Sequence, residues 1–180
     1  MKLHRRKDQL LIVFLAAGFL VGIIYENVML PKFGVTVTVF EKYFLEQYRQ
    51  MEVVTEEYLW YVTQARMIPF IGICVLGCLR WKKIVSVLWV VWTGFLSGIM
   101  TVSAIMQLGM KGILLCVAML IPHMVCYGFA YVMLLLYLFR YPEKQWNMQK
   151  TMFVVCMMFL GIILESYVNP ILVKLIAGIL

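Results

Sequence analysis

The chain has 180 residues, of which 64% are hydrophobic and 14% are charged, and its mean hydropathy is +0.91. Soluble domains contain about 45–50% apolar residues, so these values exclude a soluble globular protein and predict a single membrane domain over residues 1–180. The net charge of +7 would suit a nucleic-acid partner. Because the basic residues cluster between apolar runs, however, we read them as a topology signal and predict no nucleic-acid binding.

Five apolar segments are long enough to cross a bilayer, for which a helix needs about 20 residues. They predict an all-α polytopic membrane protein with five transmembrane helices, over about residues 10–30, 59–79, 84–108, 112–139 and 151–173. The basic N-terminus followed by an apolar run is also typical of a signal peptide. That run is long and no small-residue cleavage site follows it, so an uncleaved first helix is predicted.

Basic residues set the predicted orientation. Ten of the sixteen lysines and arginines lie in the segments Lys2–Lys7, Arg80–Lys83 and Arg140–Lys150. Positive residues favour the cytoplasmic side. The sequence therefore predicts a multi-pass membrane protein whose N-terminus is cytoplasmic and whose C-terminus is outside.

The segment 32–66, which this orientation places outside, has the pattern of an amphipathic helix. Thr38 and Glu41 fit a capping box. Apolar residues then recur at helical spacing, with charged residues on another face. The segment could lie on the outer leaflet, extend the second span as a hairpin, or bind a partner through a surface formed by Phe40, Phe44, Arg49, Glu56 and Tyr58.

Glycines in the first and third spans are spaced for close helix packing. Gly18 and Gly22 share one face of the first span with Glu26, and Gly94 and Gly98 share a face of the third. Small residues at this spacing let two helices approach closely. Lining of a substrate path is the alternative.

The fifth span contains the residue that most needs an explanation. Glu165 lies on one helix face with Gly161 and Asn169, and Pro170 follows directly. A carboxylate within a span costs about 2.5–3.5 kcal/mol on insertion scales, and the proline predicts a kink. We expect the carboxylate to point inward, within hydrogen-bonding reach of another helix.

Pro122 and His123 lie near the middle of the fourth span. The proline predicts a kink or a break between two half-helices. His123 is a candidate partner for Glu165 or Glu26, and the alternatives are a proton relay or a metal ligand.

No pattern for catalysis appears. There is no HExxH motif, the only aspartate is Asp8, and none of the serines has a glycine-rich nucleophile setting. The five cysteines all lie in apolar runs without ligand partners. We therefore predict no enzyme activity, no catalytic residues, no cofactor and no metal site.

Four features occur in a familiar order: Gly94 to Gly98, the tight turn from Gly109 to Gly112, the mid-helix Pro122–His123 pair, and the closing stretch from Glu165 to Pro170. Together with the five spans and the first outside segment, this arrangement resembles the stage II sporulation protein M family of bacterial membrane proteins. The resemblance covers most of the chain, and its closing stretch is the most specific part.

The resemblance implies a non-enzymatic scaffold in the bacterial plasma membrane, which serves engulfment of the forespore during sporulation. Such a scaffold would hold peptidoglycan-degrading proteins, a lytic transglycosylase and an amidase/endopeptidase, outside the membrane. Its other expected partner is the lipid bilayer, and self-association into a homo-oligomer stays open. The alternative function is a small-solute or proton-coupled transporter component that uses Glu165, His123 and Glu26, since broken helices beside intramembrane charge are found in transporters.

Overall fold

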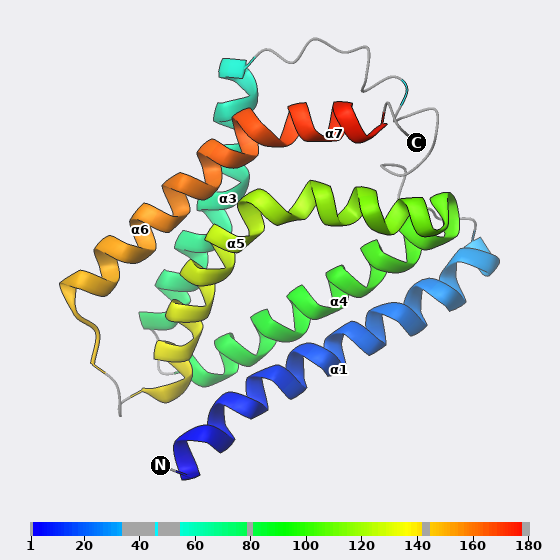
Figure 1. The fold of residues 1–180 in the computed structure, drawn as a ribbon. Coiled ribbons are helices and arrows are strands. Elements are labelled where there is room, and N and C mark those ends of the chain that lie inside the picture. Colours follow the sequence, from blue (N-terminus) through cyan, green and yellow to red (C-terminus); the bar gives the residue numbers. More distant parts are fainter. Residues whose placement is uncertain (1, 34–45, 47–54, 79–80, 142–144, 178–180) are drawn as a thin grey trace. The chain divides into compact units, whose positions relative to one another are not determined.

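The computed structural model describes residues 2–33, 46, 55–78, 81–141 and 145–177, and almost all of these lie in helices, with no strand among them (Figure 1). The elements are α1 (Lys2–Phe33), α3 (Thr55–Cys78), α4 (Lys82–Leu108), α5 (Met110–Arg140), α6 (Met148–Ile163), the π-helical turn η2 (Leu164–Val168) and α7 (Asn169–Ala177). The predicted all-α class is confirmed.

Among the described residues, five helical stretches are long and apolar enough to span a membrane: Gln9–Val28, Glu56–Cys78, Lys82–Leu108, Met119–Arg140 and Met148–Leu175. Only 17–33% of the most apolar window of each is buried inside the protein. Most of their apolar surface therefore faces outward, which is stable in lipid and not in water. The protein is a multi-pass membrane protein.

The second span begins earlier than its apolar run does. α3 starts at Thr55, and two acidic residues, Glu56 and Glu57, lie in its first turn. Acidic side chains at a helix N-terminus stabilise the exposed amide groups there. Residues 55–66 of the predicted outside segment therefore belong to the spanning helix, with Glu56 exposed and Tyr58 half-buried. The capping box, Phe40, Phe44 and Arg49 lie outside the described residues.

Contacts divide the chain into two compact units. The first contains residues 1–50, 87–117 and 177–180, and the second contains residues 51–86 and 118–176. Both α4 and α5 contribute to each unit. The two units are described separately below.

In the first unit, α1 and α4 approach closely at their glycines. A Cβ atom at Gly18 would clash with the backbone carbonyl of Val91, and one at Gly98 would clash with that of Phe19. Gly22 and Gly94 are equally crowded by the backbone of the facing helix. These glycines therefore serve helix packing in the structure, and no space for a substrate path exists at their Cα atoms.

The connection between α4 and α5 depends on two glycines. Gly109 has φ +62°, the left-handed conformation that ends helices and that glycine adopts without strain. A Cβ atom at Gly112 would clash with the Ala104 carbonyl. The start of α5 therefore packs directly against the last turns of α4.

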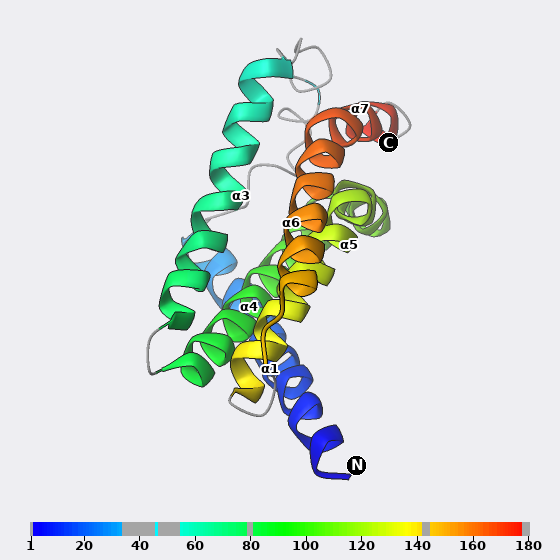
Figure 2. The same cartoon turned by 90° about the vertical axis from the view of Figure 1, so that its left-hand side faces the viewer.

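In the second unit, α6 and η2 pack against α3, and Figure 2 shows α3 and α6 side by side. Ile73, Leu138, Met158 and Val173 are almost fully buried in this unit. The core therefore draws on α3, α5, α6 and α7.

The predicted kink at Pro170 coincides with a widened helical turn. The Asn169 N–H donates to the carbonyl of Leu164, five residues back. π-Helical turns are rare and occur mostly as single-turn bulges inside α-helices, where they cause kinks. Pro170 has no N–H to continue the normal pattern. Figure 1 shows that α6 and α7 run in different directions on the two sides of η2.

At Pro122 the structure differs from one expectation. α5 is a continuous helix through this residue, so there are no two half-helices. A proline removes one backbone hydrogen bond, and packing of the neighbouring turns can keep a membrane helix intact.

Candidate functional site

Three side chains of the second unit form a polar network near the middle of their spans. Arg66 lies ten residues after Glu56 and twelve before Cys78, the two ends of its span. Glu165 lies well inside the fifth span, and Tyr127 lies inside the fourth. Because all three are remote from the span ends, the network lies deep in the membrane.

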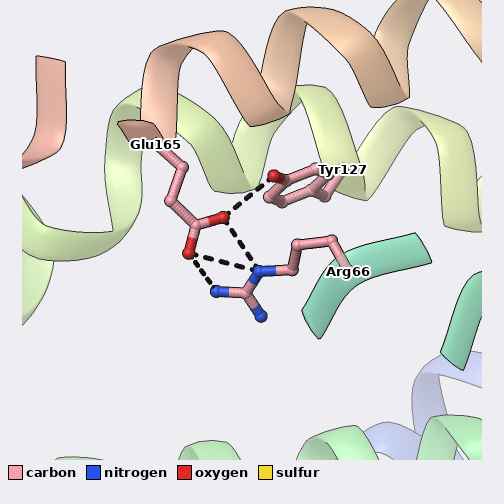
Figure 3. A network of polar contacts seen from close by, with 3 residues as sticks. All are labelled: Arg66, Tyr127 and Glu165. Carbon is pink, nitrogen blue, oxygen red and sulfur yellow. Dashed lines mark hydrogen bonds and ion pairs between the residues drawn. The ribbon is translucent and has the colours of Figure 1, made fainter. Parts of the chain in front are cut away.

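The Glu165 carboxylate accepts hydrogen bonds from two other helices, as Figure 3 shows. The Arg66 guanidinium donates through Nε to Oε2 at 2.8 Å and to Oε1 at 3.2 Å, and its Nη2 also donates to Oε1. The Tyr127 hydroxyl donates to Oε2 at 2.9 Å. The carboxylate therefore joins η2 to both α3 and α5.

Gly161 makes room for this arrangement. The ring of Tyr127 lies against α6 at this residue, and a Cβ atom there would come within 2.5 Å of the ring. Glu165 follows one turn later on the same helix face. The absence of a side chain at Gly161 thus lets the tyrosine hydroxyl reach the carboxylate.

The two charges of the network neutralise each other. A bidentate arginine–carboxylate pair is among the strongest hydrogen-bonded pairs in proteins, and the Arg66 Cζ also lies 5.5 Å from the centroid of the Tyr127 ring. The pair is unevenly buried, because 37% of the Arg66 side chain and 9% of the Glu165 side chain are exposed. Arg66 therefore closes the more open side of the network.

The predicted hydrogen bond from another helix to Glu165 is present, but His123 does not make it. His123 is 3% exposed, and its ring centroid lies 5.8 Å from that of Tyr127. Among the described residues its Nδ1 has no hydrogen-bond partner, and neither do Ser166 Oγ and Asn169 Oδ1. His123 thus lies beside the network as a neighbour of Tyr127.

A second buried acid, Glu26, belongs to the first unit. Glu26 is 4% exposed, and its Oε1 accepts a hydrogen bond from the fully buried Ser103 hydroxyl at 2.6 Å. This bond joins α1 to α4 beyond their glycine contact. Glu26 therefore has its own hydrogen-bond partner and serves the packing of α1 against α4.

Sequence reasoning missed Arg66 and Ser103 as partners. Arg66 is the last residue of the predicted outside segment 32–66, and the apolar run of the second span begins directly after it at Met67. The pattern that could have revealed it is the helical continuity from Thr55 to Cys78, which places Arg66 near mid-span. A mid-span arginine requires a buried acid, and Glu165 is the acid of the fifth span.

The chemistry available at the network is binding and packing. No group of three or more potential metal ligands occurs in the part of the chain that the structure describes. All five cysteines are free thiols. The carboxylate and the guanidinium are already occupied by each other, so the network holds helices together as it stands.

Comparison with known proteins adds no family. No protein-family model, no curated protein and no solved structure matches this chain. Its function is therefore argued from its own residues.

Proposed function

We propose that this protein is a non-enzymatic scaffold of the bacterial plasma membrane that recruits and positions peptidoglycan hydrolases during sporulation engulfment. The observation that carries the proposal is the use of Glu165. This residue belongs to the closing stretch that most resembles the stage II sporulation protein M family, and it is bonded to Arg66 and Tyr127. Through these bonds its carboxylate holds the second, fourth and fifth spans together. A scaffold needs such a rigid support for its partners.

The network also anchors α3, whose first turns carry Glu56 and Tyr58 of the proposed partner surface. α3 is continuous from Thr55, so Glu56 in its first turn and Arg66 lie on one rigid element. Because the ion pair between Arg66 and Glu165 ties α3 to η2, the outer end of α3 is held in a fixed position relative to the fifth span. Rigid elements present binding surfaces more accurately than free loops do.

The charge pattern supports the side on which this surface lies. With the three basic segments in the cytoplasm, the N-terminus is cytoplasmic and the C-terminus outside. The segment 32–66 then faces the side where peptidoglycan and its hydrolases are found.

Co-purification tests the proposal. The tagged full-length protein is extracted in mild detergent from sporulating cells, and bound peptidoglycan hydrolases are identified. Replacement of residues 38–54 by a glycine/serine linker of equal length, which leaves α3 intact, should abolish their recovery. Retention of the hydrolases by this variant would refute the surface, and their absence from the wild-type sample would refute the function.

A matched pair of point variants narrows the surface. Glu56 and Glu57 are both exposed in the first turn of α3, but they point to different helix faces. Glu56→Arg should reduce hydrolase recovery, whereas Glu57→Arg, with the same change of charge, should not. Equal loss of hydrolase recovery in both variants would show that the hydrolases respond to the charge of this turn and not to the proposed face.

A second candidate, a proton-coupled transporter component, is favoured by the buried atoms of His123, Ser166 and Asn169 that lack partners in the described residues. Buried polar atoms of this kind often hold water. The neutral double variant Arg66→Gln/Glu165→Gln separates the two functions. A scaffold should keep its partners, whereas a carrier that moves protons on Glu165 should lose proton-coupled uptake in proteoliposomes.

A further inference from the structure

A groove of about 230 Å³ opens between α5 and α6 in the second unit. Apolar and aromatic residues of α5 between Phe129 and Tyr137 line it, together with Lys150 and Phe153 of α6. The volume is below the roughly 300–1,000 Å³ of small-molecule pockets. A groove of this size and lining suits a slender apolar chain.

The groove has one end at the membrane surface and one end in the hydrocarbon. Tyr137 lies three residues before the end of α5, and Lys150 lies in the first turn of α6. Phe129 lies eight residues deeper than Tyr137, which corresponds to about 12 Å along a helix. The groove thus runs from the surface into the bilayer, parallel to lipid chains.

Aromatic contacts mark the headgroup level at the shallow end. Tyr137 and Trp146 have ring centroids 4.9 Å apart, and the Trp146 indole donates to the Thr151 hydroxyl at 2.7 Å. Tyrosine and tryptophan are enriched where the bilayer meets water. Lys150 is therefore placed where a lipid phosphate would lie.

Lys150 has capacity for an anion. Its ammonium donates to the Gln145 carbonyl at 2.6 Å, the one hydrogen bond that it makes among the described residues. A lysine ammonium carries three N–H donors, so two are available for a ligand. The positive end of the α6 dipole lies at the same place and favours negative charge.

We propose that the α5–α6 groove binds an anionic phospholipid, with one acyl chain along Phe129 and Phe153 and the phosphate at Lys150. The apolar groove supplies the site for the chain, and the lysine selects the charge of the headgroup. The site is independent of the proposed scaffold function, since it requires only the membrane and this helix pair.

Photolabelling tests the site. The full-length protein is reconstituted in phosphatidylcholine nanodiscs that contain a trace of phosphatidylglycerol with a diazirine in its acyl chain, or of phosphatidylcholine carrying the same chain. Adducts on the peptides that contain Phe129 and Phe153 are quantified by mass spectrometry. Phosphatidylglycerol should label them about fivefold more strongly, the effect of one lysine at a membrane surface. Equal labelling, or labelling spread evenly over all exposed spans, would overturn the proposal.

Matched variants separate charge from shape. Lys150→Gln should reduce phosphatidylglycerol labelling to the phosphatidylcholine level, whereas Lys83→Gln should not, because Lys83 is an exposed lysine on the same side of the membrane but outside the groove. Val132→Trp should fill the groove and remove labelling by both lipids. Val155→Trp, at an exposed position of α6 outside the groove lining, should leave it unchanged. The site would be refuted if Lys150→Gln or Val132→Trp left the labelling unchanged, or if Lys83→Gln or Val155→Trp reduced it.

A competitor distinguishes the lipid from a free anion. Excess inorganic phosphate should leave the lipid adducts unchanged, because the acyl chain adds to the affinity. Loss of the adducts in phosphate would assign the lysine to a free phosphate ion and overturn the lipid proposal.

Discussion

The ion pair between Arg66 and Glu165 makes a quantitative prediction for the stability of the fold. Glu165→Gln removes the negative charge but leaves the arginine unpaired near mid-membrane. Unpaired charge there costs about 2.5–3.5 kcal/mol on insertion scales, and breaking a buried pair costs about 3–5 kcal/mol. Because 37% of the Arg66 side chain is exposed, some of this cost is relieved by outward movement. We expect Glu165→Gln to lower the free energy of unfolding by about 2–3 kcal/mol.

The reverse change should cost more. Arg66→Gln leaves a carboxylate whose side chain is only 9% exposed and too short to reach the surface, with Tyr127 as its remaining donor. We expect a loss of about 3–4 kcal/mol. The double variant Arg66→Gln/Glu165→Gln carries no charge, and its two amides can bond to each other. Its loss should be about 1 kcal/mol, far below the sum of the single losses.

Unfolding of the reconstituted protein in mixed micelles, followed by circular dichroism, measures these differences. For a chain of this size, 1 kcal/mol corresponds to roughly 2–4 °C in Tm. Lys83→Gln serves as the control, because it removes an exposed charge outside the network. Single variants as stable as the wild type, or a double variant whose loss equals the sum, would refute the assignment of the ion pair as a structural clamp.

Three further predictions follow from the packing and the charge pattern. Gly161→Val should displace the ring of Tyr127 and lower the Tm, whereas Gly128→Ala, where a Cβ atom meets nothing within 4 Å, should be tolerated; equal losses would contradict the packing role. Gly98→Leu should separate α1 from α4 and abolish folding, while Gly72→Leu, at an open position, should leave the helical content unchanged; a folded Gly98 variant would disprove the tight contact. A reporter that is active only outside the cytoplasm should be active at the C-terminus and inactive at the N-terminus, and the opposite pattern would reverse the proposed orientation.

The pattern of residues was enough to predict the elements of the fold. Runs of about 20 apolar residues must form helices in a membrane, because lipid offers no partners to an unsatisfied backbone. This local rule predicted five spans and the all-α class. It also located the distortion ahead of Pro170, since the missing N–H acts within one turn. The predicted start of the second span, near residue 59, lies inside α3, which the structure describes from Thr55.

The partners of the buried charges depended on tertiary structure. From the sequence alone, Glu165 had to point inward, because a lone carboxylate in lipid is costly. Which helix would supply the donor depended on how the spans pack, and packing brings Arg66 across 99 positions of sequence. His123 lies nearer to Glu165 in sequence than Arg66 does, and its imidazole could donate to a carboxylate. The space that Gly161 leaves is filled instead by the ring of Tyr127. Periodicity fixes the face on which a side chain lies, and only the assembled helices fix what it meets.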